Sequence, residues 1–192
     1  MTSYSDLIAQ ILDVEWRMFQ AVKSASPAAC QSAPETFKKV RGSVFEVWSK
    51  KMLESYLDDL KLAQETGRNL LAEKYARMDN LIPPLNVNPL ISKVVGIEAD
   101  WQKELEEKYP SLYARTCRGT DPVQNGSNFS IYLKSELETY SDRTVELYYL
   151  ETKKAYDNKK NLAALALDGL VRKGGYRDIE HAEECLKTTD NS

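Results

Sequence analysis

Four charged residues stand in the middle of apolar helical stripes, where packed core side chains are expected. In the string LDVEWRMFQAV, residues 12–22, the apolar residues recur at helical spacing, and Glu15 falls on the same face. Three further segments repeat this arrangement. The four residues are Glu15, Arg41, Glu98 and Glu136. Three acids and one base on inward faces could bind a cation or take part in acid–base chemistry.

The cost of burying a charge limits what these residues can do. An unpaired buried charge costs on the order of several kcal/mol. One interpretation is therefore an ion-pair network around Arg41 that fixes the packing of the helices. Another is a polar pocket whose clustered carboxylates bind a cation or move a proton, with Tyr140 as a further member. A third is that the helical phase is off by one position and the groups are exposed. We expect Glu15, Arg41, Glu98 and Glu136 to be mostly buried in one cluster.

The segment GRNLLAEKYARMDNLIPP, residues 67–84, is the densest in charge. Glu73 and Arg77 are four residues apart, in the orientation that favours a surface ion pair of about 0.3–0.5 kcal/mol. The segment also carries three basic residues, Arg68, Lys74 and Arg77. Two interpretations are open. The helix is exposed to solvent and carries surface ion pairs, or one of its faces binds an anion such as a phosphate. Tyr75 lies on the apolar edge of the same helix.

The composition is that of an ordinary soluble globular protein. The chain has 192 residues, 42% of them hydrophobic and 29% charged, which suffices for one domain with a sizeable core. The net charge of −3 argues against broad nonspecific binding to nucleic acid, and we expect no DNA partner. No apolar run approaches the ~20 residues that span a membrane, and Asp6 stands where a signal peptide carries positive charge. We expect a cytoplasmic protein without a membrane partner.

The cysteines and the histidine argue against several kinds of site. Cys30, Cys117 and Cys185 are odd in number, widely spaced and form no CxxC motif, unlike a disulfide framework or a structural zinc site. The only histidine, His181, cannot supply the two Glu-x-x-His pairs of a di-iron bundle. In the string DIEHAEECL it fits the surface of a C-terminal helix. We expect no metal and no cofactor.

The pattern is helical almost throughout, and no convincing run alternates apolar with polar residues. The predicted helices cover residues 5–23, 34–66, 69–80, 89–108, 129–157, 162–173 and 178–187. Ser3 or Ser5 can cap the first of them, and the second has a break at Gly42 or near Ser49 as an alternative. The prediction is an all-α fold, a single compact bundle of about seven helices spanning residues 1–192. Its core covers about residues 5–187, and the last few residues are expected to be disordered.

Several strings along the chain resemble one family. The chain resembles domain of unknown function 4125 in EW and MF of the first helix, CQ at residues 30–31, SYLDDL, GRNLLAEKYARMDNLIPP, KYP and YLKSELETYSDRT. The resemblance extends from about Leu7 to Glu184 and by itself implies no activity. Less closely, the chain is similar to the small fungal arginine-containing cyclodipeptide synthases. These enzymes use two aminoacyl-tRNAs to make a diketopiperazine that contains arginine.

The resemblance to the synthases implies roles for the residues singled out above. An arginine side chain pairs with carboxylates in bidentate fashion, so the inward acids would help to form its pocket. The substrate-binding candidates are Glu15, Arg41, Glu98, Tyr140, Glu73 and Tyr75, the catalytic candidates are Glu136, Asp58, Asp59 and Tyr56, and the tRNA-binding candidates are Arg68, Lys74 and Arg77. The acidic DDxxE motif of the synthases is matched at Asp58 and Asp59, whereas Leu62 stands at its last position.

The transfer of an acyl group needs little beyond positioning, a base for the attacking amine and donors for the oxyanion. A serine ester intermediate would use Ser55 or Ser135 as the nucleophile. Further candidates for contact with tRNA are the lysines at positions 50, 51, 153, 154, 159 and 160.

Three functions are open at this point. The first is an aminoacyl-tRNA-dependent cyclodipeptide synthase of secondary metabolism, with arginyl-tRNA among its substrates. The second is a different metal-free enzyme that acts on a small amine or amino acid in the same pocket. The third is a non-enzymatic helical binding protein whose buried charges are structural. A search for a new arginine-containing diketopiperazine after expression in bacteria separates the first from the other two.

Overall fold

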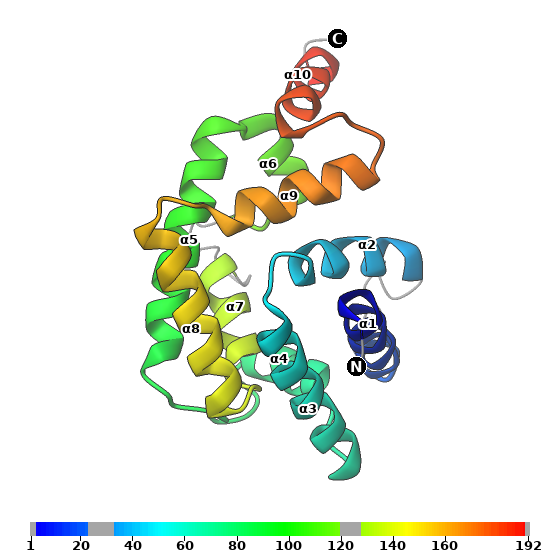
Figure 1. Cartoon of the computed structure of the whole chain (residues 1–192), viewed down its shortest axis with the longest axis vertical. Helices are drawn as coiled ribbons and strands as arrows, with labels where there is room; N and C mark the ends of the chain where they lie inside the picture. The colour runs from blue at the N-terminus through cyan, green and yellow to red at the C-terminus, as the bar shows by residue number, and fades with distance from the viewer. Residues whose placement is uncertain (1–2, 23–32, 120–127, 191–192) are drawn as a thin grey trace.

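The computed structural model is built of helices and the turns between them (Figure 1). It describes residues 3–22, 33–119 and 128–190. The helices in these ranges are α1 (Tyr4–Gln20), α2 (Pro34–Phe45), α3 (Lys50–Glu65), α4 (Leu70–Met78), α5 (Leu90–Lys108), α6 (Pro110–Thr116), α7 (Phe129–Leu137), α8 (Asp142–Asp157), α9 (Leu162–Lys173) and α10 (Ile179–Asp190). No strand occurs in the described ranges, which confirms the all-α prediction.

The helix predicted over residues 34–66 is divided near Ser49, one of the two alternative breaks. The hydroxyl of Ser49 accepts a hydrogen bond of 3.3 Å from the backbone N–H of Met52 and so caps the first turn of α3. The hydroxyl of Tyr4 lies 2.8 Å from the carbonyl oxygen of Trp48 and 3.2 Å from that of Phe45. The bend between α2 and α3 is therefore held by a side chain from α1.

The helix predicted over residues 129–157 is also divided, into α7 and α8. Ser141 caps α8 by accepting a hydrogen bond of 3.3 Å from the backbone N–H of Thr144. The carboxylate of Asp59, on α3, accepts a hydrogen bond of 3.0 Å from the backbone N–H of Ser141. With these two divisions and the additional helix α6, the described part of the chain holds ten helices rather than about seven.

The first and last helices of the bundle have the following ends. Ser3 caps α1 in a capping box, because its hydroxyl accepts from the backbone N–H of Asp6 and the Asp6 carboxylate accepts from the backbone N–H of Ser3. α10 continues to Asp190, beyond the predicted end at residue 187. Cys30 and Gln31 lie outside the described residues. None of the described helices is both long enough and apolar enough to span a membrane.

Buried apolar side chains form two groups that α5 connects. The larger group lies among α1, α2, α3, α4, α7 and α8 and includes Val94, from the first half of α5. The smaller group lies among α6, α9, α10 and the second half of α5, which contributes Leu105. α9 packs against both α2 and α5, so it closes the space between the two groups (Figure 1).

Candidate functional site

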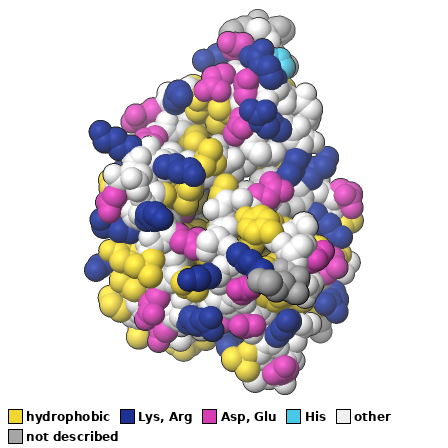
Figure 2. Space-filling model, in the orientation of Figure 1, with side chains coloured by type: hydrophobic (Ala, Val, Ile, Leu, Met, Phe, Trp, Pro, Cys, Tyr) yellow, Lys and Arg dark blue, Asp and Glu magenta, His cyan; other side chains and the backbone are white. Residues whose placement is uncertain are grey.

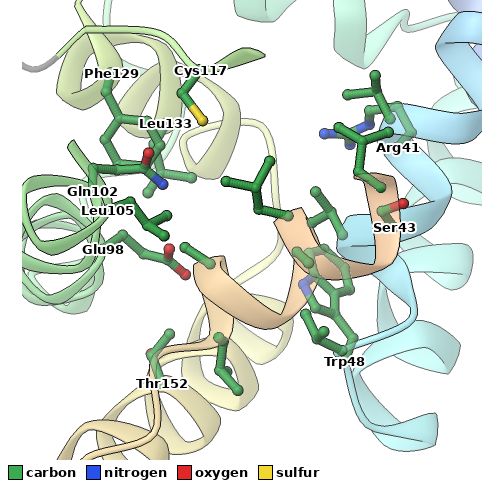
Figure 3. A pocket seen from close by; sticks show the side chains of 18 of the residues that line it. Arg41, Ser43, Trp48, Glu98, Gln102, Leu105, Cys117, Phe129, Leu133 and Thr152 are labelled. Atoms are coloured by element: carbon green, nitrogen blue, oxygen red, sulfur yellow. The ribbon is translucent and has the colours of Figure 1, made fainter. Parts of the chain in front are cut away.

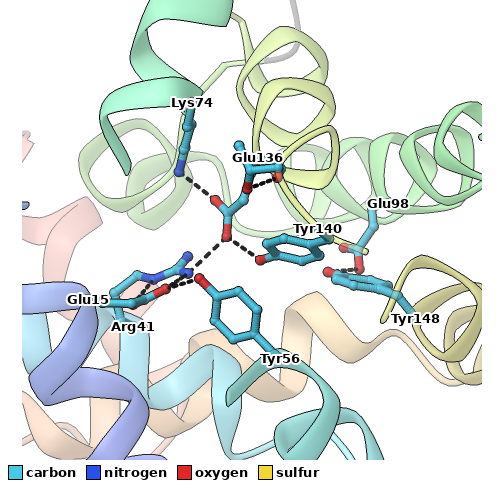
Figure 4. A network of polar contacts seen from close by, with 9 residues as sticks. Glu15, Arg41, Tyr56, Lys74, Glu98, Glu136, Tyr140 and Tyr148 are labelled. Carbon is cyan, nitrogen blue, oxygen red and sulfur yellow. Dashed lines mark hydrogen bonds and ion pairs between the residues drawn. The ribbon is translucent and has the colours of Figure 1, made fainter. Parts of the chain in front are cut away.

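Arg41 of α2 joins two carboxylates that come from different helices (Figure 4). Its Nε and Nη2 atoms donate to the two oxygens of Glu15 on α1, over 2.9 and 2.5 Å. Nη2 also donates to Glu136 on α7, over 2.8 Å. Glu15 and Glu136 are buried, and Arg41 is largely buried. Three of the four core charges therefore lie in one buried cluster, as predicted.

A lysine and two tyrosines complete this ion cluster. Lys74 of α4, a buried residue, donates to Glu136. The hydroxyl of Tyr56 donates to Glu15 over 2.7 Å, and the hydroxyl of Tyr140 donates to Glu136 over 2.8 Å. Two carboxylates face the two cations, Arg41 and Lys74, and each carboxylate also accepts from a tyrosine. The ion cluster is therefore balanced in charge without any added group.

The electrostatics of the ion cluster keep Glu136 ionised. Burial alone would raise the pKa of Glu136, but Arg41 and Lys74 together lower it well below its ordinary value. A carboxylate with so low a pKa is a weak base, which does not suit the catalytic role expected for Glu136. The guanidinium pocket expected at Glu15 is filled by the chain's own Arg41.

Glu98 of α5 lies apart from the ion cluster. Its side chain accepts a hydrogen bond of 3.1 Å from the hydroxyl of Tyr148 and makes no other hydrogen bond or ion pair with the described residues. Burial raises the pKa of Glu98 to about 7, although the hydrogen bond from Tyr148 opposes that shift. The prediction of a single cluster is wrong for Glu98, because α5 packs along α8 and sets Glu98 against Tyr148.

A cavity of about 190 Å³, which we refer to as the chamber, lies beside Glu98 and between the two groups of core side chains (Figure 3). Its walls come mainly from α2, α5, α7, α8 and α9 and are largely apolar, with Trp48, Leu133 and Leu167 among them. The polar side chains that line it are Arg41, Ser43, Glu98, Gln102, Thr116, Cys117, Tyr132, Glu136, Tyr148, Glu151 and Thr152. A mostly apolar cavity with a few convergent polar groups is typical of a small-molecule site.

Arg41 lines the chamber and has one pair of N–H groups that no described residue uses. Its Nε and Nη2 atoms bind the two carboxylates, whereas Nη1 makes no hydrogen bond to the described residues. The hydroxyl of Ser43 is engaged, since it donates to the carbonyl oxygen of Lys39 and accepts from Lys173, both over 2.9 Å. Burial raises the pKa of the Cys117 thiol, which keeps it protonated at neutral pH. Nη1 of Arg41 is therefore available to donate to a ligand oxygen, and the two potential nucleophiles, Ser43 and Cys117, are not activated.

The model of the family DUF4125, whose description is "Protein of unknown function", matches residues 5–184. The chain belongs to this family. No curated protein matches the chain, and no solved structure matches it. The DUF4125 match contains every residue of the ion cluster and of the chamber. The description of the family names no activity, so the function must be argued from the site itself.

Two of the three basic residues predicted to hold tRNA phosphate are turned inward in this DUF4125 chain. Lys74 is only 5% exposed and is used by Glu136. The Arg77 side chain is 12% exposed and pairs with Glu138, at the end of α7. An exposed basic face is therefore a wrong prediction for Lys74 and Arg77, because α4 packs against α7 and brings both side chains to acids there. Figure 2 shows basic and acidic side chains mixed over the face it draws.

The surface ion pair predicted on α4 has a different partner. Glu73 pairs with Arg68, through contacts of 2.9 Å to Nε and 2.6 Å to Nη2, rather than with Arg77. Arg68 is the one member of the predicted basic face that solvent reaches easily. Tyr75 is partly buried and lines a second, smaller cavity of about 30 Å³ beside the ion cluster. Neither Glu73 nor Tyr75 lines the chamber.

The two aspartates of SYLDDL are not brought together with Glu136. Asp58 is exposed, and Asp59 holds the N-terminus of α8 through the backbone N–H of Ser141. Leu62, at the last position of the acidic motif, is 56% exposed. Tyr56 alone of this segment's candidates reaches the ion cluster. The structure thus assigns Asp59 a capping contact and gives Asp58 no contact with the chamber.

The serines and the histidine singled out from the sequence also lie away from the chamber. The hydroxyl of Ser55 is 2.7 Å from that of Thr144, and Ser135 is buried on α7. His181 is partly exposed on α10, where its Nδ1 accepts from the backbone N–H of Arg177 over 3.3 Å. Within the described ranges, no three His, Cys, Asp or Glu side chains are grouped so as to hold a metal ion.

The sequence analysis did not single out most of the polar residues that line the chamber, and Gln102 and Tyr148 are two of these. Gln102 follows Glu98 by four positions on α5, so the helical spacing that placed Glu98 also placed Gln102 on the same face. Tyr148 belongs to α8, and nothing in the sequence indicated that its hydroxyl meets Glu98. That contact depends on how α5 and α8 pack.

Proposed function

We propose that this DUF4125 chain is an aminoacyl-tRNA-dependent cyclodipeptide synthase that takes arginine as one of its two amino acids. The observation that carries the proposal is the isolation of Glu98, a buried carboxylate without a cationic partner among the described residues, in a largely apolar chamber. A buried ionised carboxylate is unfavourable until a cation pairs with it. The guanidinium of an arginyl group supplies that cation and suits bidentate pairing.

In the proposed reaction, the α-amino nitrogen of one aminoacyl ester attacks the ester carbonyl carbon of the other. A C–N bond forms, the ester C–O bond breaks, and the first tRNA leaves with the proton that the amine loses. A second attack of the same kind closes the diketopiperazine ring and frees the second tRNA. An α-amino group has a pKa of about 7.7–8.0, so on the order of a tenth of it is neutral at pH 7. Positioning therefore provides much of the acceleration without a strong base.

Arg41 is the donor that we propose for the oxyanion. The tetrahedral intermediate carries negative charge on the former carbonyl oxygen, and Nη1 of Arg41 is unused at the wall of the chamber. Donors that are already oriented stabilise such charge most effectively. Glu15 and Glu136 fix the guanidinium of Arg41, and we propose them as positioning residues rather than as the arginine pocket.

Lysines at the end of α8 are the proposed contacts for tRNA. Lys154, Lys159 and Lys160 are exposed and form no ion pair with the described residues. Leu162 and Ala163, which line the chamber, follow directly in the chain. Contacts with phosphates supply affinity that does not depend on sequence. A tRNA held by these lysines would have its aminoacyl end close to the chamber.

A binding protein for a cationic small molecule is the second candidate. It is favoured by the absence of an activated nucleophile among the described residues of the chamber, since the Ser43 hydroxyl is engaged and the Cys117 thiol has a raised pKa. A different metal-free enzyme for an amine or amino acid would use the same chamber and the same Glu98.

Expression in bacteria followed by mass spectrometry of the medium tests the proposal. The wild-type chain should release a new diketopiperazine that contains arginine, and an empty vector should not. Soluble, folded protein without such a product would reject the synthase and leave the binding protein. Addition of isotopically labelled arginine to the culture identifies the amino acid, because the label must appear in the product.

A further inference from the structure

We infer that Gln102 is a specificity-determining residue, whose carboxamide binds the carbonyl or amide group of the ligand one helical turn from the guanidinium held by Glu98. The inference rests on the proposed function only in taking the ligand of the chamber to be cationic. It adds a second point of recognition and therefore a spacing that the ligand must match.

Gln102 is a buried residue, 8% exposed, whose carboxamide has no hydrogen-bond partner among the described residues. Figure 3 shows its terminal oxygen and nitrogen turned into the chamber. No fully buried side-chain nitrogen or oxygen of the described residues lacks a hydrogen-bond partner, so the carboxamide atoms of Gln102 are accessible from the chamber and are free to bind a group from outside the chain. Water can satisfy it in the empty chamber, and a ligand with matching groups would displace that water.

The spacing of Glu98 and Gln102 defines the ligand. Residues four apart on a helix have their Cβ atoms about 5–6 Å apart on one face. Glu98 offers a carboxylate for a cation, and Gln102 offers one donor group and one acceptor for an amide or ester. The side-chain guanidinium and the carbonyl group of an arginyl residue are separated by a flexible chain that spans this distance. An α-ammonium group is two bonds from the carbonyl carbon and is too close to it to use both positions.

The chemical class of ligand is therefore an arginyl amide or ester, which includes the linear and cyclic dipeptides of arginine. A ligand with the guanidinium but without the carbonyl group would use Glu98 alone. A ligand with the amide but an uncharged side chain would leave Glu98 without its cation.

Two ligands and two variants test the inference by isothermal titration calorimetry on the full chain at pH 8. L-Argininamide carries the guanidinium and the amide, and agmatine is the same molecule without the amide. The wild-type chain should bind L-argininamide about tenfold more tightly than agmatine, the ratio expected for one buried hydrogen-bonded group. Gln102→Leu should reduce the affinity for L-argininamide to that for agmatine and leave agmatine unchanged. The matched control Gln64→Leu, at an exposed position of α3, should change neither affinity.

Three results would overturn the inference. The wild-type chain could bind neither ligand, or it could bind L-argininamide no more tightly than agmatine. The third is that Gln102→Leu lowers the affinity for both ligands equally. A thermal melt accompanies each titration, and Gln102→Met, close in shape to glutamine, replaces Gln102→Leu if the latter does not fold. The calorimetry is independent of catalysis. The predicted pattern of affinities without a diketopiperazine in the expression test would reject the synthase and retain the role of Gln102.

Discussion

The hydroxyl of Tyr148 donates a hydrogen bond of 3.1 Å to Glu98, and no other described residue forms a hydrogen bond or ion pair with that carboxylate. Glu136, also buried, is met by two cations and a tyrosine. The two acids arise from the same sequence pattern, an acid within an apolar stripe. Their surroundings assign them different tasks: Glu136 balances the ion cluster, and Glu98 faces a chamber in which a ligand can pair with it.

Glu98→Gln is expected to stabilise the ligand-free protein at pH 8. Burial raises the pKa of Glu98 from 4.5 to about 7, so the folded chain keeps a proton that the unfolded chain loses within that range. The stability of the wild-type protein therefore falls as the pH rises from about 4.5 to 7, by up to about 3 kcal/mol, and the variant does not share this loss. Urea denaturation of both proteins between pH 4 and 8 measures the difference. A difference in stability that does not change with pH would contradict the assignment.

Glu136→Gln is expected to destabilise the protein by about 3–5 kcal/mol at pH 7, because Arg41 and Lys74 would then share one carboxylate in a buried site. The pKa of Glu136 is lowered in the folded state, so its contribution is present above the ordinary pKa and is lost as the pH falls through the lowered value. The destabilisation caused by Glu136→Gln should therefore become smaller at acidic pH. Because Glu136 also positions Arg41, turnover per folded molecule should fall as well, but thermal melts beside a turnover assay should show a smaller free-energy change for turnover than for stability.

A double variant is the control for this prediction. Lys74→Met together with Glu136→Gln removes one cation and one acid and leaves the Arg41–Glu15 pair balanced. The double variant should lose less stability than the sum of the two single variants, since neighbours that share a network are not additive. Simple additivity would show that Lys74 and Glu136 do not depend on each other.

Asp59→Ala and Asp58→Ala are expected to differ. Asp59 accepts a hydrogen bond from the backbone N–H of Ser141 at the start of α8, and its loss should cost about 1 kcal/mol. Asp58 is exposed, and its replacement should change the free energy of unfolding by less than about 0.5 kcal/mol. Neither change should abolish turnover, because neither residue lines the chamber. Loss of all activity in both folded variants would restore the catalytic role that the DDxxE resemblance implies for them.

Charge reversal at the end of α8 is expected to weaken tRNA binding. Lys159→Glu with Lys160→Glu removes two proposed phosphate contacts, so the slope of log affinity against log salt should flatten by about 1–2. The matched control reverses Lys61 and Lys103, which are exposed on other helices, and carries the same net charge. Filter binding at several salt concentrations measures both slopes. An equal loss of tRNA affinity in the two variants would show that only the net charge matters and that the tRNA surface lies elsewhere.

The helices and the inward direction of the charged residues could be predicted from the sequence, because apolar spacing reports which face of a helix is buried. The breaks at Ser49 and Ser141 were harder to predict, since the apolar spacing continues across them. Each break depends on a distant residue, Tyr4 in one case and Asp59 in the other. Local patterns carry no information about such contacts.

The partners of the charged residues could not be predicted for the same reason. Lys74 stands in a basic run that predicts exposure, yet the packing of α4 on α7 sets it against Glu136. The sequence predicts that Arg41 lies with three other inward charges, and it meets Glu15 and Glu136 but not Glu98. A helical wheel gives the direction of a side chain and not the element that it meets.

The most direct test of the central claim is a reaction with purified protein, tRNA charged with isotopically labelled arginine, and a mixture of other aminoacyl-tRNAs. Wild-type chain and Glu107→Gln, a control at an exposed position of the same helix, should release a labelled cyclic dipeptide that mass spectrometry detects. Glu98→Gln should release about 30- to 100-fold less, because the guanidinium loses its charged partner. Equal amounts of product from Glu98→Gln, or no labelled product from folded wild-type protein, would contradict the account.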